Sequence, residues 1–492
     1  MAIGQFMRGW VNPLDLERLK LFGKRIRTLT FSEGSRVSGV VGSSAAVTIA
    51  SALRGECLFP NLEKLVWELQ GDSNATLPLC ISPGLRKVDV YAHYTALDPT
   101  WADGIFTFVQ SLAHSNVQLS ELTVHVPCSH SMVNIIPSAF SKLKSLHLTL
   151  DHGSDRSFDL AFLRGLTQLD HLETLNLDCP FFALDLPEGH SSLCFQHVKQ
   201  LYVTCPFDDV FNLLAITTFP SLYSFDFEFI LPLDLHETYE YDWKRLLGAI
   251  HGVASPSKVH GISLIPWRPV WTDNDVHYHF FRKFYPGVPF EDLAESLLRF
   301  KLIHFICPFP LFRSLTMDNL KAIVRPWRFI GILYLYTADA SEGNAVGLDA
   351  LHYLASNLPF LFNLSIALDA SVGTMNTTPA RFGQSVEAFS VRLFRNKRLL
   401  STVSELASHV DTLFPNLRTY RELAANWDDV NEEDGSMFTQ LVSVIKQARE
   451  RERNHISAAG CPEKTWLIQE DILYRRIVDM IRTDIMSSRS RS

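Results

Sequence analysis

The sequence lacks the local motifs of metal, redox and catalytic sites. None of its eight cysteines forms a C-x-x-C pair, so zinc sites and redox dithiols have no local support. Scattered cysteines in a chain of this length are typical of reduced core residues. A G-x-S-x-G elbow, a G-x-G-x-x-G loop, a Walker loop and an H-E-x-x-H pair are also missing. These absences predict a protein that is not an enzyme and holds no cofactor.

Long apolar runs and an excess of positive charge are missing as well. The most apolar stretch, 329–338, is too short to span a bilayer. The opening residues MAIGQFMRGWVNP lack the apolar centre of a signal peptide. The net charge is -8, whereas a general nucleic-acid binder needs a basic footprint. We expect a monomer in the cytoplasm or nucleus, with no nucleic-acid partner and no membrane contact.

What the sequence does contain is an internal repeat. Hydrophobic residues make up 47% of the 492 residues, which is typical of a folded chain. One heptad recurs as LNLDCPF (175–181), LYVTCPF (201–207) and IHFICPF (303–309). The first two cysteines lie 26 residues apart, and Cys205 and Cys307 lie 102 apart, which is about four such steps. A period near 26 falls within the ~20–29 residues of leucine-rich repeats.

Phe-Pro pairs mark the same period. They occur at 59, 219, 309 and 414, each just before an L-x-x-L-x-L run that predicts a strand. Around 300–319 two frames compete, FKLIHFIC and LFRSLTMDN, and the sequence does not decide between them. The predicted runs begin at Ile26, Leu62, Leu85, Leu119, Leu143, Leu172, Val198, Leu222, Val259, Phe300, Ile330, Leu361 and Leu417.

The segments between these runs predict helices. Residues 159–171, 207–218 and 348–360 carry apolar side chains at helical spacing. Strand, turn, helix and turn form one repeat, which buries its apolar stripe only against its neighbours. We therefore predict an α/β fold, a leucine-rich-repeat-like solenoid in which a curved parallel sheet carries outer helices and a C-terminal helical cap.

The predicted solenoid spans residues 26–424, after an N-terminal helical cap at 1–25. Three segments do not fit the period and predict insertions near 232–257, 266–299 and 371–412. Residues 425–492 predict an acidic linker, C-terminal helices and a disordered tail. Within the 232–299 insertions, the alternating Asp273, Asp275, His277 and His279 leave a metal-dependent or hydrolytic site as an alternative to a solvated loop.

The opening of the predicted solenoid resembles a known family. From Val11 the chain reads VNPLDLERLKLFGKRIRTL, similar to the start of the repeats in F-box/leucine-rich-repeat proteins of mushroom-forming fungi (basidiomycetes), P-x-D-W-x-R-F-x-x-Y-A-x-R-V-R-x-L. LFPNLEKLVWEL (58–69) resembles a following repeat, and LFPNLRTYRELAANWDD (413–429) resembles the closing strand. The resemblance covers roughly 11–455. The matching positions are Pro13, Asp15, Arg18, Arg25, Arg27 and Leu29.

The resemblance implies the substrate-recognition part of an F-box type ubiquitin-ligase receptor. In that family an F-box precedes this opening and binds the adaptor of a cullin-type ligase. Here ten residues precede Val11, and they lack the L-P-x-E-hydrophobic pattern of that module. Either the sequence is truncated or the module has been lost, so an adaptor is expected as a partner only in the first case. The alternative is a non-ligase scaffold protein.

The strand runs also predict a partner-binding surface. Side chains alternate along a strand, so residues flanking the apolar positions point out of the core onto the concave face. An acidic face dotted with aromatic groups suits a basic segment of a protein partner, and the alternative is that these are only solvated strand residues. The predicted binding residues are Asp89, Tyr91, His125, His147, Asn176, Asp178, Tyr202, Asp226 and Glu228.

Overall fold

A computed structural model describes most of the predicted solenoid. The described residues are 12–31, 43–69, 73–92, 100–125, 130–150, 158–179, 182–183, 192–230, 241–267, 287–338, 346–347, 349–369, 386–394, 413–414, 417 and 419–422. The predicted C-terminal linker, helices and tail lie outside these ranges, as do Asp273, Asp275, His277 and His279.

One parallel sheet runs the length of the described chain. Its 14 strands follow sequence order, and neighbouring strands pair in parallel throughout. They are β1 (Thr28–Phe31), β2 (Lys64–Leu69), β3 (Lys87–Ala92), β4 (Glu121–His125), β5 (Ser145–Thr149), β7 (Thr174–Asp178), β10 (Gln200–Pro206), β12 (Ser224–Ile230), β13 (Gly261–Trp267), β14 (His304–Ile306), β15 (Ile332–Leu335), β16 (Asn363–Asp369), β17 (Ala388–Phe394) and β18 (Thr419–Glu422).

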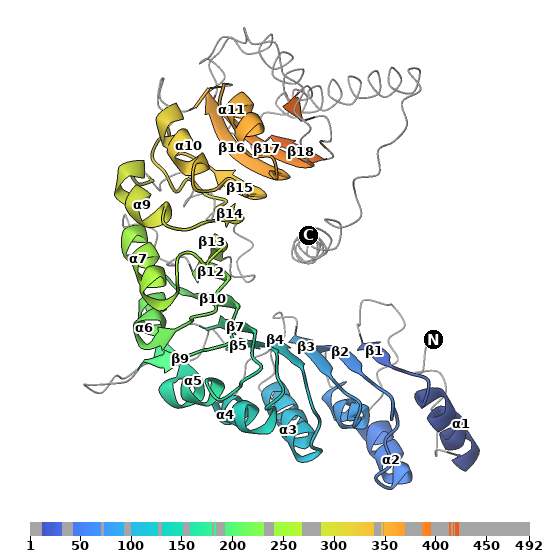
Figure 1. Cartoon of the computed structure of the whole chain (residues 1–492). Helices are drawn as coiled ribbons and strands as arrows, with labels where there is room; N and C mark the ends of the chain where they lie inside the picture. Colours follow the sequence, from blue (N-terminus) through green and yellow to red (C-terminus); the bar gives the residue numbers. More distant parts are fainter. Residues whose placement is uncertain are drawn as a thin grey trace, which may run out of the picture.

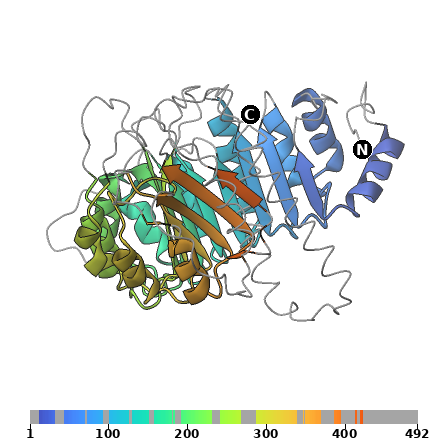
Figure 2. The same ribbon diagram turned by 90° about the horizontal axis from the view of Figure 1, so that it is seen from above.

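Helices cover one side of this sheet. They lie on the outside of a curved ribbon whose inner surface is formed by the strands (Figure 1), and the view from above again places them outside the strands (Figure 2). They are α1 (Pro13–Gly23), α2 (Ser43–Leu53), the 3-10 helix η2 (Ser73–Cys80), α3 (Thr100–His114), α4 (His130–Ala139), α5 (Leu160–Leu166), α6 (Asp209–Ile216), α7 (Trp243–Val253), α9 (Phe290–Leu297), α10 (Met317–Val324) and α11 (Asp349–Asn357).

Two short strand pairs supplement the main sheet. β6 (Phe158–Asp159) pairs with β8 (Phe182–Ala183), and β9 (Leu193–Cys194) pairs with β11 (Thr217–Thr218). Both pairs are parallel, like the main sheet. The described chain is therefore an α/β leucine-rich-repeat-like solenoid, as predicted.

The L-x-x-L-x-L runs explain why the units stack. In the second repeat Leu62, Leu65 and Trp67 are at most 1% exposed, because all three point between the sheet and its helices. Leu65 lies opposite Val88, which lies opposite Leu122, so each repeat adds its apolar side chains to one continuous core. A single repeat would leave that stripe exposed to water.

The structure selects one of the two frames around residue 300 and corrects its start. His304 pairs with Gly261, so Leu302 occupies the position that Val259 holds in the previous repeat. The run therefore begins at Leu302, and the prediction of Phe300 was wrong by two residues. Phe300 is also fully buried, which is why the pattern alone misplaced it. Phe312, from the other frame, forms isolated parallel bridges outside the main sheet.

The predicted insertions contain parts of ordinary repeats. Helix α7 lies within 232–257, helix α9 lies within 266–299, and strand β17 lies within 371–412. β17 pairs along seven residues with β16 and then with β18, so it is a full member of the sheet. The irregular spacing reflects longer connections between elements and not the loss of whole repeats.

The cysteine period was only partly correct. β7 and β10 are adjacent, so the 26-residue interval from Cys179 to Cys205 is one repeat. Strands β12 and β13 separate β10 from β14, which makes the interval to Cys307 three steps instead of four. Cys80, Cys179, Cys205 and Cys307 are buried thiols without a disulfide, as expected of core residues.

Candidate binding surface on the concave face

The parallel register aligns the outward side chains into rows. One row joins Asp89, Thr123, His147, Asn176, Tyr202, Asp226 and Ser263, each the direct neighbour of the next across the sheet. A second row lies two residues further along the strands. In it Tyr91 is the neighbour of His125, and Thr204 lies between Asp178 and Glu228. All nine predicted residues therefore lie on strands and on the concave face.

The N-terminal strands neutralise their own carboxylates. Lys87 Nζ lies 2.6 Å from Glu121 Oε2 and 3.6 Å from Asp89 Oδ2. Asp89 is only 5% exposed, and burial raises its pKa although Lys87, Thr123 and Lys64 counteract the increase. With a lysine of the same chain beside it, Asp89 is poorly placed to recognise a cation of another molecule.

Two imidazoles and a phenol form a stacked cluster on β3 to β5. The Tyr91 and His125 rings are stacked with centroids 5.1 Å apart, and the His125 and His147 rings meet edge to face at 3.8 Å. Asn176 Nδ2 donates to His147 Nδ1 over 3.2 Å. Burial and the neighbouring His125 hold the pKa of His147 well below its usual value, so this imidazole is neutral at pH 7.

Asp226 of β12 differs from Asp89 in its surroundings. Ser224 Oγ donates to Asp226 Oδ2 over 2.9 Å, and Ser263 is its other hydrogen-bonding side chain. Loss of hydration raises the pKa of Asp226 to about 6, and these two hydroxyls only partly counteract that increase. In the described strands β5 to β16, no lysine or arginine occupies an outward position of the concave face.

His304 completes the surroundings of Asp226. Its Nε2 lies 3.2 Å from Ser224 Oγ, and the Ser224 hydroxyl donates onward to Asp226. Gly261 provides the space for this imidazole, since a methyl group at that position would overlap the ring. Burial lowers the pKa of His304 to about 4, with a smaller effect from His260, so His304 supplies no positive charge at pH 7.

Sequence reasoning missed Ser263 and His304. Both belong to the row positions found by continuing the L-x-x-L-x-L frame from Val259 and Leu302. The shift of two residues at Phe300 leaves His304 on the outward face, because side chains alternate with a period of two. Both residues were missed because the predicted binding residues ended at Glu228 of β12. The structure brings His304 to Ser224 across 80 residues of sequence.

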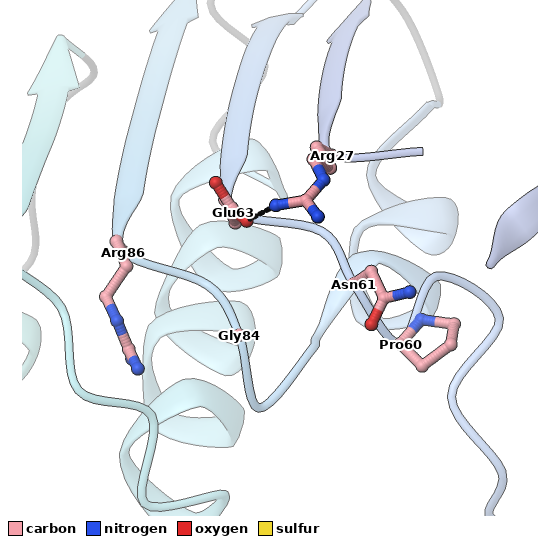
Figure 3. A pocket seen from close by; sticks show the side chains of 6 residues that line it. All are labelled: Arg27, Pro60, Asn61, Glu63, Gly84 and Arg86. Carbon is pink, nitrogen blue, oxygen red and sulfur yellow. Dashed lines mark hydrogen bonds and ion pairs between the residues drawn. The ribbon is translucent and has the colours of Figure 1, made fainter. Parts of the chain in front are cut away.

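A pocket lies elsewhere, at the amino ends of β1 to β3. Figure 3 shows it between the turns that precede these strands, with Arg27 paired to Glu63 and with Arg86 to one side. Arg86 Nη1 donates to the carbonyl oxygens of Leu85 and Gln118, at 3.3 and 3.2 Å. These hydrogen bonds hold the strand-start turns together, so the pocket is explained by packing.

Neither a metal cluster nor a membrane-spanning helix is found in the part of the chain that the structure describes. No group of three or more histidine, cysteine, aspartate or glutamate side chains there could hold a metal ion. Likewise, none of the described helices has the length and apolar character needed to cross a bilayer.

The chain was compared with known proteins. No family model matches it, and no curated protein matches its sequence. Among solved structures, a leucine-rich-repeat protein of Leptospira interrogans is 13% identical over 85% of this chain and 89% of that one, with a TM-score of 0.33. A chain of the yeast Rad7 and Elc1 complex is 11% identical over 75% and 77%, with a TM-score of 0.34.

A third similar structure is the leucine-rich-repeat-containing protein LegL7 of Legionella pneumophila. It is 11% identical over 85% of this chain and 96% of that one, with a TM-score of 0.29. These scores are low, so the fold assignment rests on the strand register described above.

Proposed function

We propose that this chain is a non-enzymatic recognition protein, present in the cytoplasm or nucleus, that binds a basic segment of a protein partner on its concave face. Asp226 supports this proposal most directly. Its carboxylate lies on the inner surface, its hydrogen-bonding side chains among the described residues are the hydroxyls of Ser224 and Ser263, and the outward positions of β5 to β16 offer no lysine or arginine. A partly desolvated carboxylate is stabilised by a cation, and an incoming lysine or arginine would supply one.

The neighbouring groups fit the same ligand. Tyr202 adjoins Asp226 in the row that runs from Asp89 to Ser263, and Glu228 follows two residues later on β12. An aromatic face beside carboxylates suits the alkyl stem and charged end of lysine or arginine. The partner segment would then lie across the strands, with its basic side chains over β7 to β12.

A binding assay tests this function with a fluorescein-labelled peptide that alternates lysine or arginine with glycine and serine. We expect Asp226→Asn to weaken binding by about tenfold, the effect of losing one charged contact of roughly 1.4 kcal/mol. Glu121→Gln removes the same charge from the concave face, but Lys87 already pairs with Glu121, so its effect should be small. Equal effects of the two variants would refute the proposal.

We further propose that the chain is related to the substrate-recognition part of F-box type receptors, on the resemblance of residues 11–29 and 413–429. A non-ligase scaffold is the alternative. A pull-down with the cullin-ligase adaptor separates the two, provided that any in-frame coding sequence upstream is included. Binding of the adaptor supports the receptor, and no binding by such an extended protein supports the scaffold.

A further inference from the structure

A row of residues at the amino ends of the strands forms a rim along the solenoid. From the second member onward, each backbone N–H donates to the carbonyl oxygen of the previous member, and these hydrogen bonds join thirteen repeats without a break. The row is Arg27, Glu63, Arg86, Ser120, Lys144, Glu173, Lys199, Tyr223, His260, Ile303, Gly331, Phe362 and Glu387. We call these residues, with the turn residues directly before them, the amino rim.

The composition of the amino rim changes abruptly after Lys199. The first seven members are charged or polar, and they include the pairs Arg27–Glu63 and Glu173–Lys199. From Tyr223 to Phe362 the members are aromatic, imidazole, aliphatic or glycine. Tyr223 is 40% exposed and packs against the His260 ring at 5.0 Å. Backbone geometry is the same in both halves, so the change is not a requirement of the repeat.

Two phenylalanines make the second half apolar at its surface. Phe329 and Phe360 directly precede Ile330 and Leu361, the first core residues of adjacent repeats. Their side chains are 66% and 45% exposed. Their ring centroids lie 5.6 Å apart. At the corresponding turn positions other repeats carry residues such as Arg25, Asn61 and Lys142. Phe362 lies over Gly331, where a methyl group would clash with its ring, and extends the apolar surface.

This apolar surface has a positive border. Lys258, Lys301 and Arg328 belong to the same turns and are exposed, and no aspartate or glutamate occurs in 217–223, 254–260, 298–303, 325–331 or 358–362. The one acidic member of this half, Glu387, follows Phe362 at the end of the row. Two contacts hold the border in place. Trp327 Nε1 donates to the Phe300 carbonyl over 3.1 Å, which brings Arg328 near Lys301, and His260 Nδ1 lies 2.9 Å from the Lys301 carbonyl oxygen.

We propose that this aromatic rim, formed by Phe329, Phe360 and Phe362 with Lys301 and Arg328, is a second docking surface. Its partner is a segment of another protein that carries an apolar side chain flanked by carboxylates. Exposed phenylalanine pairs contribute binding energy when a partner covers them, and a border of one charge selects the opposite charge. The rim and the concave face therefore select partners of opposite sign, and the rim does not depend on the function proposed above.

Fluorescence anisotropy tests the proposal with a labelled peptide in which one tryptophan is flanked on both sides by aspartates. We expect saturable binding that Phe329→Ser/Phe360→Ser weakens by about tenfold or more. Lys301→Glu/Arg328→Glu should weaken binding to a similar extent and reduce its salt dependence. The matched control is Lys142→Glu/Lys144→Glu, which reverses two charges at the polar half of the rim and should leave the affinity within about twofold.

The four substituted rim residues are exposed, so we expect both double variants to fold, as circular dichroism would verify. Binding that survives Phe329→Ser/Phe360→Ser, or that the control weakens equally, overturns the proposal. No binding by the unchanged protein also overturns it. In that case, binding that appears once Asp428, Asp429, Glu432 and Glu433 are neutralised would identify the chain's own acidic segment as the occupant. Asp226→Asn should not affect this peptide, which separates the test from that of the concave face.

Discussion

Asp226 and Asp89 occupy the same row of the concave face but have different neighbours. Asp89 has Lys87 at 3.6 Å, whereas Asp226 has the hydroxyl groups of Ser224 and Ser263. Sequence alternation correctly predicted that both would point out of the core. Lys87 and Ser224 stand two residues before Asp89 and Asp226 on the same strands, whereas Ser263 reaches Asp226 from the next strand, which only the register shows. Residues at binding sites commonly reduce the stability of the free protein in this way.

Asp226→Asn should therefore stabilise the protein while weakening binding. The pKa of about 6 in the folded protein exceeds the ordinary aspartate value of 3.8, so the folded state binds the proton of Asp226 more tightly than the unfolded chain does. Ionisation then costs stability as pH rises from about 4 to above 6, and that cost persists at higher pH. At pH 7.5 we expect the variant to be more stable by about 1–2 kcal/mol in urea unfolding. At about pH 4 the two proteins should be equal, and a variant that is less stable at both pH values contradicts this account.

Gly261→Ala tests the space that His304 occupies. The added methyl group would overlap the imidazole, so we expect a loss of about 1–3 kcal/mol in the free energy of unfolding. Gly248→Ala is the control, since nothing lies within 4 Å of a Cβ at that helical position. It should be neutral or stabilise by up to about 1 kcal/mol. Adding His304→Ala to Gly261→Ala should restore part of the loss, and no restoration would place the strain elsewhere.

At the scale of single elements, the repeat pattern predicted strands better than it predicted their exact frames. Leu62, Leu65 and Trp67 fit the three apolar positions of the L-x-x-L-x-L pattern because all three are buried in one core. Phe300 misled the pattern because it is as apolar and as deeply buried as a strand residue, with its ring packed edge to face against His251 at 4.4 Å. Strand β17 was missed because its three apolar positions follow an irregular interval, and only its pairing with β16 identifies it as a strand.

Helix α10 begins with a capping box that offers a local test. Thr316 Oγ1 accepts from the Asn319 backbone N–H at 3.2 Å, and the Asn319 side chain accepts from the Thr316 backbone N–H at 2.9 Å. Thr316→Ala removes the first bond and should cost about 1 kcal/mol in urea unfolding. Thr316→Ser keeps the hydroxyl and should cost much less. Equal losses for the two variants would show that the methyl group, and not the cap, matters.

At the scale of the whole molecule, charge is unevenly distributed over one regular backbone. The concave face carries Asp178 on β7 and Asp226 and Glu228 on β12, on either side of β10, whereas the turns of the amino rim from Tyr223 to Phe362 carry Lys258, Lys301 and Arg328 without a carboxylate. Composition alone, with a net charge of -8, hides this division. Only the strand register shows which charges share a surface.

This division predicts that the two surfaces bind probes of opposite charge independently of each other. Raising ionic strength from about 0.05 to about 0.5 M should weaken both the basic and the acidic peptide, because screening shortens the reach of each surface. Substitutions on one surface should leave the other probe unaffected. Titration of each variant with both peptides measures this directly. A substitution on the concave face that strongly weakens the acidic probe would show that the two surfaces are not independent.

Site-specific photocrosslinking tests recognition on the concave face most directly. A benzophenone amino acid would replace Tyr202 on the inner surface or, in a second protein, the exposed Asn212 on helix α6. We predict that the basic peptide crosslinks at position 202 and not at 212, and that Asp226→Asn reduces the yield. Crosslinking at 212 instead, or equal yield with and without the Asp226 carboxylate, would contradict binding along the inner surface.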